Sequence, residues 1–358
     1  MKIALILGTR PEIIKMAPVI RELEKHKDSY FILHTGQHYS YNLDMIFFEQ
    51  LQLPPARYNL EAGSGSHAAQ TAKILIGVER VLSEENPDIV LVEGDTNSVL
   101  AGAMAAAKLR VKVGHVEAGL RSYDRGMPEE INRILTDHCS DFLFAPTERA
   151  KTILLGEGVP EKTIFVTGNT IVDAVYQNLE LMRSDDAALA NLHLEPKKYF
   201  LVTLHRQENV DSADRFRAIL QGLGEVAAEF QIQVIYPVHP HSKKRITEFN
   251  LESQNLTLIE PVDYLGFLQL ENNARLILTD SGGVQEEACV LGVPCVTLRD
   301  NTERPETLEA GSNVLAGALP ARILECVRTM MGKETGWQNP FGDGKAGKRI
   351  IDIIKERL

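Results

Sequence analysis

Carboxylates that could exchange protons with a bound molecule lie in the first half of the chain. Asp95 follows the apolar run DIVLVE, Glu117 lies in the segment GHVEAGLR, and Glu129 follows Pro128. Asp95 could instead cap a helix, and the helix dipole would favour an acidic residue at position 129 or 130. Glu117 stands in no obvious cap. Carboxylates of this kind act as general acids and bases, which accelerate reactions by about 10²–10⁴-fold.

A histidine beside an arginine marks the second half of the chain. His205 and Arg206 follow the apolar run YFLVTL. Such a pair after a strand favours a catalytic or binding role over a purely structural one. His239 and His241, in the segment PVHPH, are explained equally well by loop packing. Their spacing differs from that of paired metal ligands such as H-E-x-x-H, and we expect no metal site.

Two turns that contain glycine could bind an anion. The first, GTRPE, spans residues 8–12, and the N–H groups at the start of a helix attract negative charge. Arg10 adds a guanidinium there, and Lys15 follows one turn later. A capped helix with solvated charges would have the same sequence. The chain contains neither a G-x-G-x-x-G fingerprint nor a Walker lysine motif.

The second turn, DSGGVQEE, spans residues 280–287 after an apolar run that ends at Thr279. Its two glycines allow the backbone to approach a phosphate closely, and a glutamate one turn into the helix could accept hydrogen bonds from ribose hydroxyls. A glycine-rich turn with an acidic first helical turn is the structural alternative. The segment NTERPE, residues 301–306, adds Arg304 as a second contact for a phosphate.

The elements that must position these residues alternate between short apolar runs and longer amphipathic segments. The apolar runs are β-branched on both faces, as in parallel sheets covered by helices. The series restarts after the less apolar stretch 182–198, which predicts two doubly wound, Rossmann-like α/β domains facing across a cleft. The expected strands are 3–7, 31–34, 88–93, 112–115, 142–145, 199–204, 234–237, 256–259, 276–279 and 295–298. Polar loops follow these strands and predict an interdomain active site.

Length and charge agree with a large globular protein. The 358 residues predict two domains, at roughly 100–200 residues each. We place the first at residues 1–172 together with an amphipathic helix at about 343–358 that packs back on it, and the second at 173–342. The chain carries 38 Lys and Arg against 49 Asp and Glu, a net charge of −11. That balance argues against nucleic acids and anionic membranes as partners.

The remaining features predict a cytoplasmic protein. The four cysteines form no C-x-x-C pair, and we expect reduced thiols. The start of the sequence, MKIALILGTRPE, is typical of a first strand rather than of a signal peptide. The sequence has no run of about 20 apolar residues, so we expect no membrane span.

A series of segments in this order resembles one family, the non-hydrolysing UDP-N-acetylglucosamine 2-epimerases, which have the GT-B glycosyltransferase-like fold. The match covers nearly the whole chain, and the order of the segments makes it specific. The segments are GTRPEIIKMAPVI, TGQHYSYNLDMIFF, EGDTNSVLAGA, HVEAGLRS, MPEEINRILTDH, FAPTE, GNTIVDA, TLHRQEN, YPVHP, DSGGVQEEA and LRDNTERPE.

The resemblance implies reversible inversion of carbon 2 of UDP-N-acetylglucosamine, which gives UDP-N-acetylmannosamine for cell-surface polysaccharides. UDP would be eliminated to leave 2-acetamidoglucal and then added back, without a cofactor. The ligands would be UDP-N-acetylglucosamine and UDP, and the assembly a homodimer. Uronic or diacetamido derivatives are alternative substrates. A UDP-sugar-dependent glycosyltransferase of the same fold, a hydrolysing 2-epimerase and a non-catalytic sugar-nucleotide sensor are alternative functions.

On the matching positions, the resemblance also implies residue roles. The catalytic residues would be Asp95, Glu117, Glu129 and His205. A second, regulatory sugar-nucleotide pocket would be formed by Gln37, His38, Glu130 and His239. The substrate-binding residues would be Arg10 and Lys15 at the phosphates, Ser281, Gly282 and Gly283 at the diphosphate, Glu287 at the ribose, Arg304 at the phosphates or the sugar, and the segment from Val262 to Phe267 at the uracil. Glu130 and Glu286 are the neighbouring alternatives to Glu129 and Glu287.

Overall fold

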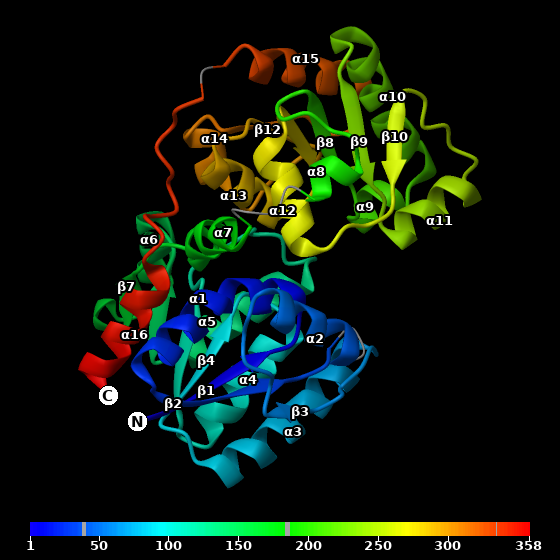
Figure 1. The fold of residues 1–358 in the computed structure, drawn as a ribbon. Coiled ribbons are helices and arrows are strands. Elements are labelled where there is room, and N and C mark those ends of the chain that lie inside the picture. Colours follow the sequence, from blue (N-terminus) through cyan, green and yellow to red (C-terminus); the bar gives the residue numbers. More distant parts are fainter. Residues whose placement is uncertain (38–40, 183–186, 334) are drawn as a thin grey trace. The chain divides into compact units, whose positions relative to one another are not determined.

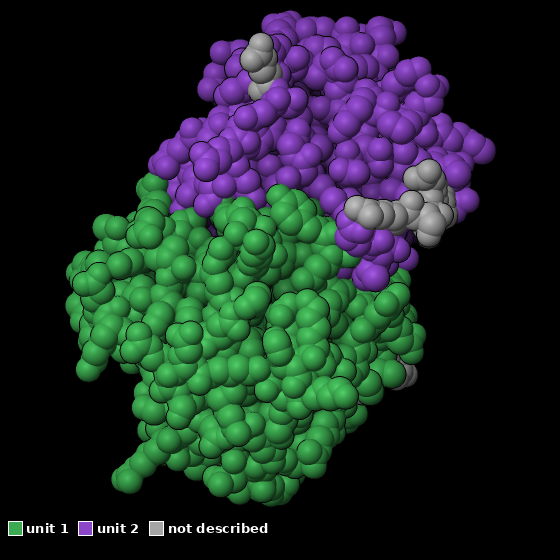
Figure 2. All heavy atoms as spheres, turned by 60° about the vertical axis from the view of Figure 1, so that its left-hand side comes forward, with its two compact units in different colours: residues 1–177, 341–358 green, residues 178–340 purple. Residues whose placement is uncertain are grey.

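A computed structural model describes the chain except for residues 38–40, 183–186 and 334. The described residues form two compact units, one made of Met1–Gln177 with Phe341–Leu358 and the other of Asn178–Pro340 (Figure 2). Each unit is a parallel sheet with helices packed on it, which confirms the predicted α/β class. No helix among the described residues is long and apolar enough to cross a membrane.

The first unit contains a seven-stranded parallel sheet (Figure 1). In sequence, its strands are β1 (Lys2–Leu7), β2 (Ser29–His34), β3 (Tyr58–Asn59), β4 (Ile89–Glu93), β5 (Lys112–Val116), β6 (Phe142–Ala145) and β7 (Ile164–Val166). Their order in the sheet is β3-β2-β1-β4-β5-β6-β7. The order reverses between β1 and β4, and open α/β sheets bind ligands beyond the carboxyl ends of the strands at such a point.

Helices connect these strands and enclose the core of the first unit. They are α1 (Arg10–His26), α2 (Tyr41–Gln50), α3 (His67–Glu85), α4 (Asn97–Lys108), α5 (Pro128–Cys139), α6 (Glu148–Gly156), the 3₁₀ helix η1 (Glu161–Thr163), α7 (Thr170–Leu181) and α16 (Ala346–Arg357). The carboxyl-terminal helix α16 packs on α1, as predicted. A Cβ at Gly347 would lie 3.0 Å from the carbonyl carbon of Pro18, and Asp173 accepts hydrogen bonds from the N–H groups of Ala346 and Gly347.

The second unit contains a six-stranded parallel sheet. In sequence, its strands are β8 (Tyr199–Thr203), β9 (Gln233–Pro237), β10 (Leu256–Ile259), β11 (Leu276–Thr279), β12 (Cys295–Thr297) and β13 (Asn313–Leu315), in the order β10-β9-β8-β11-β12-β13. The helices are α8 (Ala187–Asn191), α9 (Gln207–Val210), α10 (Ala213–Phe230), α11 (Pro240–Glu248), α12 (Tyr264–Asn273), α13 (Gly282–Leu291), α14 (Pro305–Glu309) and α15 (Pro320–Met331). The order reverses between β8 and β11, so this sheet also offers a binding edge.

Three short strands extend the predicted set. β3, β7 and β13 span only two or three residues each, which is too few to show the apolar pattern that predicts a strand. All three lie at sheet edges, where one side of the strand needs no partner. The strands that carry the candidate loops are all among those predicted.

Candidate active site

Lys15 lies between two carboxylates at the carboxyl edge of the first sheet. Its Nζ donates a hydrogen bond to Glu117 and lies 3.5 Å from Oε1 of Glu93, the last residue of β4. All three side chains are buried. Burial holds the pKa of Glu93 well above its usual value, and attraction to Lys15 offsets this only in part. A predicted phosphate ligand and a predicted catalytic carboxylate are therefore in direct contact, beside an acid that the sequence analysis does not single out.

The backbone at Glu117 is strained. Its φ of 71° lies in the left-handed region, which residues other than glycine rarely adopt. The N–H of Glu117 donates a hydrogen bond of 3.1 Å to the carbonyl of Phe144 on β6, which fixes the loop after β5. No described helix begins at Glu117, so a capping role is absent. Strain of this kind, held in place by its neighbours, is concentrated at functional sites.

Glu12 joins the turn after β1 to the loop after β4. Its carboxylate accepts hydrogen bonds from the N–H of Gly8 and from the hydroxyls of Thr9 and Thr96, the last two at 3.0 and 2.7 Å. Burial raises the pKa of Glu12 to about 7, although these hydrogen bonds act in the opposite direction. The sequence indicates Glu12 only through its place in GTRPE, because nothing in that segment reports its burial.

Asp95 and Glu130 share one arginine. Oδ2 of Asp95 lies 2.5 Å from Nη2 of Arg133 on α5, and Nη1 of Arg133 lies 2.8 Å from Glu130. Glu130 also accepts hydrogen bonds of 2.9 Å from the N–H groups of Ser122 and Tyr123. Burial tends to raise the pKa of Glu130, but these hydrogen bonds outweigh it and hold the pKa below its usual value. Glu130 therefore anchors the loop that leads into α5.

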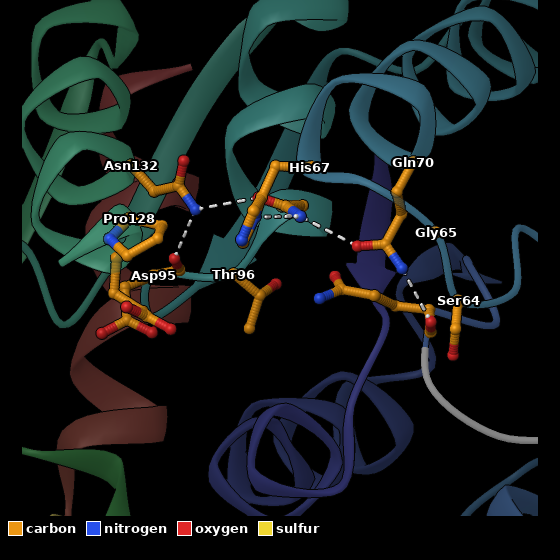
Figure 3. A pocket seen from close by; sticks show the side chains of 11 residues that line it. Ser64, Gly65, His67, Gln70, Asp95, Thr96, Pro128 and Asn132 are labelled. Carbon is orange, nitrogen blue, oxygen red and sulfur yellow. Dashed lines mark hydrogen bonds between the residues drawn. The ribbon is translucent and has the colours of Figure 1, made fainter. Parts of the chain in front are cut away.

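A pocket of ≈ 310 Å³ in the first unit is lined by both Asp95 and Glu129. Figure 3 shows Asp95 beside Pro128, the residue that precedes Glu129. Glu130 does not line it, so Glu129 is the better placed of the two neighbours to reach a ligand there. The other lining residues are Gln37, Ser64, Gly65, His67, Gln70, Thr96, Asn97, Pro128 and Asn132. The predicted residues Asp95, Glu129 and Gln37 thus come together in one cavity.

A chain of amide side chains crosses this pocket (Figure 3). Asn132 donates hydrogen bonds to the carbonyl of Asp95 at 2.9 Å and to Oδ1 of Asn97 at 3.3 Å. Asn97 donates to Oε1 of Gln70 at 2.8 Å, and Gln70 donates to the carbonyl of Gln37 at 2.9 Å. Asn97, Gln70 and Asn132 are not among the residues predicted from the sequence, because amides from three different helices form no sequence motif.

Three further candidate residues do not line this pocket as described: Arg10, His38 and His239. The guanidinium of Arg10 lies over the ring of Phe47, 4.9 Å from its centroid. His38 lies outside the described residues. His239 belongs to the second unit, where its Nδ1 accepts a hydrogen bond from the N–H of His241 at the start of α11. Among the described residues, no group of three or more His, Cys, Asp or Glu could hold a metal ion.

In the second unit, Asp280 holds His205. The N–H of His205 donates to the Asp280 carboxylate at 3.1 Å, and Nδ1 of its ring lies 3.1 Å from Oδ1. Arg206 and Asn209 also donate to Asp280. Burial tends to raise the pKa of Asp280, but His205 and these donors hold it below its usual value. The side chain of His205 is 48% exposed, so its ring is fixed at one end and accessible to a ligand.

The glycine-rich turn leaves room in front of α13. Ser281 precedes the helix, which begins at Gly282. A Cβ at Gly282 or Gly283 would lie 3.9 Å or more from the nearest atoms outside the turn's own backbone. Packing therefore does not demand glycine at either position. The open space beside the N–H groups of a helix start suits a phosphate.

The neighbours Glu286 and Glu287 have different partners. Oε1 of Glu286, which is fully buried, lies 2.5 Å from Nε of Arg304. Oε1 of Glu287 accepts a hydrogen bond of 3.0 Å from the hydroxyl of Tyr264 on α12. Arg304, a predicted ligand of the phosphates or the sugar, is thus engaged with the glutamate that the resemblance treats as the alternative.

The predicted uracil segment forms the start of α12. Val262 and Phe267 are partly buried against an apolar cluster of the second unit. Asp263 caps the helix by accepting a hydrogen bond of 2.7 Å from the N–H of Gly266. The segment therefore combines apolar surface with a fixed backbone, which a planar base requires.

Comparisons with known proteins agree over the whole chain. The family model described as UDP-N-acetylglucosamine 2-epimerase matches residues 21–355. A Methanocaldococcus jannaschii protein named UDP-N-acetylglucosamine 2-epimerase is 56% identical over 99% of both chains. A Pseudomonas aeruginosa protein named UDP-2,3-diacetamido-2,3-dideoxy-D-glucuronate 2-epimerase is 42% identical, again over 99% of both.

A solved structure gives the same result. The crystal structure of the M. jannaschii UDP-GlcNAc 2-epimerase in complex with UDP-GlcNAc and UDP is similar with a TM-score of 0.92 and 56% identity. The match covers 99% of this chain and 100% of that one. The chain therefore belongs to the UDP-N-acetylglucosamine 2-epimerase family.

Proposed function

We propose that this protein catalyses the reversible epimerisation of UDP-N-acetylglucosamine to UDP-N-acetylmannosamine, as an isomerase that needs no cofactor and supplies cell-surface polysaccharide synthesis. The observation that carries the proposal is the 56% identity, over 99% of both chains, to a protein named for this activity. The solved structure of that M. jannaschii enzyme contains UDP-GlcNAc and UDP, the expected substrate and leaving group.

The chemistry explains why carboxylates surround the site. The proton on carbon 2 is not acidic while the sugar is intact, because no carbonyl is adjacent. Departure of UDP breaks the bond from carbon 1 to oxygen, and a carboxylate removes the proton as the double bond to carbon 2 forms. The products of this step are 2-acetamidoglucal and UDP. Re-addition of UDP, with proton delivery to the opposite face of carbon 2, gives the epimer.

Asp95, Glu117, Glu129 and His205 are the proposed catalytic residues. Asp95 and Glu129 line one pocket of the first unit, which suits two groups that handle protons at neighbouring positions of a substrate. Glu117 has the strained backbone described above. The ring of His205 is fixed by Asp280 and half exposed.

The second unit supplies the proposed nucleotide site. Ser281, Gly282 and Gly283 would bind the diphosphate with N–H groups at the start of α13, where a Cβ would find open space. Glu287 would accept hydrogen bonds from the ribose, and the uracil would lie along residues 262–267. The cationic groups proposed to stabilise the departing UDP are Arg10, Lys15 and Arg304. Positive charge on a leaving diphosphate lowers the barrier to its departure.

A second sugar nucleotide is the proposed regulator. Gln37 lines the same pocket as Asp95 and Glu129, so a ligand there could act on the catalytic residues through the amide chain. His38, Glu130 and His239 are the other residues proposed for this role. Rate curves that are sigmoidal in UDP-N-acetylglucosamine, and hyperbolic after Gln37→Ala, are the expected result. Hyperbolic curves for the unaltered protein would contradict it.

We also propose a cytoplasmic homodimer and keep the domain division at residues 1–172 with 343–358, and 173–342. An apolar groove of ≈ 580 Å³ runs between α3 and α5 and supports self-association. Ile76 on α3 and Leu135 on α5 are 67% and 42% exposed. Light scattering should give twice the monomer mass, and Ile76→Asp should reduce that mass towards the monomer.

One incubation tests the proposed activity against its alternatives. The protein is incubated with UDP-N-acetylglucosamine alone in deuterated water, and the products are followed by NMR. We expect UDP-N-acetylmannosamine with deuterium at carbon 2. Free N-acetylmannosamine plus UDP would indicate a hydrolysing 2-epimerase, and unchanged substrate would favour a glycosyltransferase or a sensor.

The 42% identity to the P. aeruginosa protein favours one further substrate class. The same assay with the UDP-2,3-diacetamido uronate tests which of the two sugar nucleotides is the substrate. Faster deuterium incorporation into that sugar would overturn the assignment of UDP-N-acetylglucosamine.

A further inference from the structure

The buried side chain of His115, on β5, faces a hydrogen-bond acceptor at each ring nitrogen. Nδ1 lies 2.6 Å from Oδ1 of Asp137 on α5, and Nε2 lies 2.8 Å from the carbonyl oxygen of Gly94. The residue is 1% exposed, so water cannot replace either partner. A neutral imidazole carries a proton on only one nitrogen, whereas an imidazolium carries one on each.

Asp137 cannot supply the missing proton as a neutral acid. Its Oδ2 lies 2.7 Å from Nη2 of Arg121 and accepts a hydrogen bond from the N–H of Gly119. Arg121 pairs in turn with Glu157, at 2.7 Å. When His115 is charged, it and Arg121 therefore balance the charges of the two carboxylates, Asp137 and Glu157.

The Nε2 contact fixes the backbone that precedes Asp95. Gly94 has a φ of 85°, in the left-handed region that favours glycine, and its carbonyl faces Nε2 of His115. The next carbonyl, that of Asp95, accepts a hydrogen bond from Asn132 on α5. Asp137 lies on the same helix, which begins with Pro128 and Glu129. His115 therefore connects the loop that carries Asp95 to the helix that carries Glu129.

We infer that His115 carries a proton on each ring nitrogen and is a positioning residue, which holds Asp95 and Glu129 in register by bridging the Gly94 carbonyl and Asp137. The inference rests on the proposed catalytic roles of Asp95 and Glu129. His115 itself is buried beneath the loop and exchanges no proton with the substrate.

The protonation state is measured directly by NMR on full-length protein labelled with ¹⁵N-histidine. We expect one-bond N–H couplings at both ring nitrogens of His115 at neutral pH. The chain has 10 histidines, and the signals that disappear in His115→Asn identify this one. A ring nitrogen without a proton would overturn the inference, whatever the activity of the protein.

Two amide variants separate the two contacts. The amide of His115→Asn can replace Nδ1 and donate to Asp137, whereas that of His115→Gln can replace Nε2 and donate to the Gly94 carbonyl. Because the Gly94 contact positions Asp95, we expect His115→Asn to lower kcat by about 10²-fold and His115→Gln by clearly less. KM and the affinity for UDP should change little in either.

His193→Gln is the control, because this histidine is exposed and belongs to the second unit, whereas His115 belongs to the first. It should leave kcat unchanged. Unchanged kcat in both His115 variants, or a loss of UDP affinity that parallels the loss of kcat, would overturn the positioning role. A wild-type protein that fails to epimerise UDP-N-acetylglucosamine would refute the proposed function, while the NMR result would still decide the state of His115. If both variants fail to fold, the His115 signals are assigned by elimination, with the other nine histidines replaced one at a time, and the couplings then decide the protonation state.

Discussion

The ammonium of Lys15 donates a hydrogen bond to the carboxylate of Glu117, although the two residues are 102 positions apart in the chain. In the proposed mechanism, Lys15 binds the diphosphate and Glu117 handles a proton. Before substrate binds, the ammonium of Lys15 and the carboxylate of Glu117 are therefore hydrogen-bonded to each other. A diphosphate that attracts the ammonium would release the carboxylate, and this would couple substrate binding to the availability of the base.

Replacing Lys15 with methionine tests this coupling. Lys15→Met removes the cation but keeps the length of the side chain. We expect kcat/KM for UDP-N-acetylglucosamine to fall by at least about 10-fold, with lower thermal stability because Glu93 and Glu117 lose their nearby charge. Lys25→Met, at an exposed lysine of the same helix, should change neither quantity. Wild-type kcat/KM in Lys15→Met would contradict the proposed role.

Two carboxylates should be needed for turnover but not for UDP binding. Asp95→Asn and Glu117→Gln remove a proton acceptor with little change in shape, so we expect kcat to fall by about 10²–10⁴-fold. Calorimetry should show that both variants still bind UDP, because the proposed contacts to the uracil, the ribose and the glycine-rich turn lie in the second unit. Asp214→Asn, at a side chain that is 97% exposed, controls for the substitution itself. A comparable loss of UDP affinity in both variants would refute the assignment.

Glu12 should make the protein less stable as pH rises. Its usual pKa of 4.5 applies to the unfolded chain, and burial raises the pKa in the folded protein to about 7. Between these values the folded state binds more protons, so the stabilisation is complete at low pH and is lost as pH approaches 7. One such group contributes a slope of roughly 1.4 kcal/mol per pH unit.

Urea denaturation across this range, compared with Glu12→Gln, isolates the contribution of Glu12. The variant should have a shallower loss of unfolding free energy. Glu79→Gln changes an exposed glutamate of α3 and should keep the wild-type slope. Parallel curves for the wild type and Glu12→Gln would show that Glu12 is not the group responsible.

An added methyl group at Gly283 should lower the affinity for UDP without lowering the stability of the fold. The new Cβ would lie 3.9 Å from Ser281 Oγ, its nearest neighbour, so we expect Gly283→Ala to leave stability equal or slightly higher. The methyl would occupy space proposed for the diphosphate, and UDP affinity should fall by about 10-fold or more. Gly222→Ala, whose Cβ would come within 3.0 Å of Pro320 and Ile323, should instead lower the melting temperature. Unchanged UDP affinity in Gly283→Ala would place the diphosphate elsewhere.

The sequence by itself determined the fold class and the segments that carry the site. Apolar runs of four to six residues that alternate with helical segments indicate parallel sheets covered by helices. They place GTRPE and DSGG directly after strands and HVEAGLR across the end of a strand. These signals are local, because each depends on residues adjacent in the chain. The strands β3, β7 and β13 are too short to carry such a signal.

Only the tertiary structure decided which side chains meet. It engages Glu130 with Arg133 and its own loop while Glu129 lines the pocket, although the two are adjacent in sequence. It also buries Glu12 and places an acceptor at each nitrogen of His115. These outcomes depend on partners from distant segments and on the exclusion of water, neither of which is encoded in the spacing of a motif.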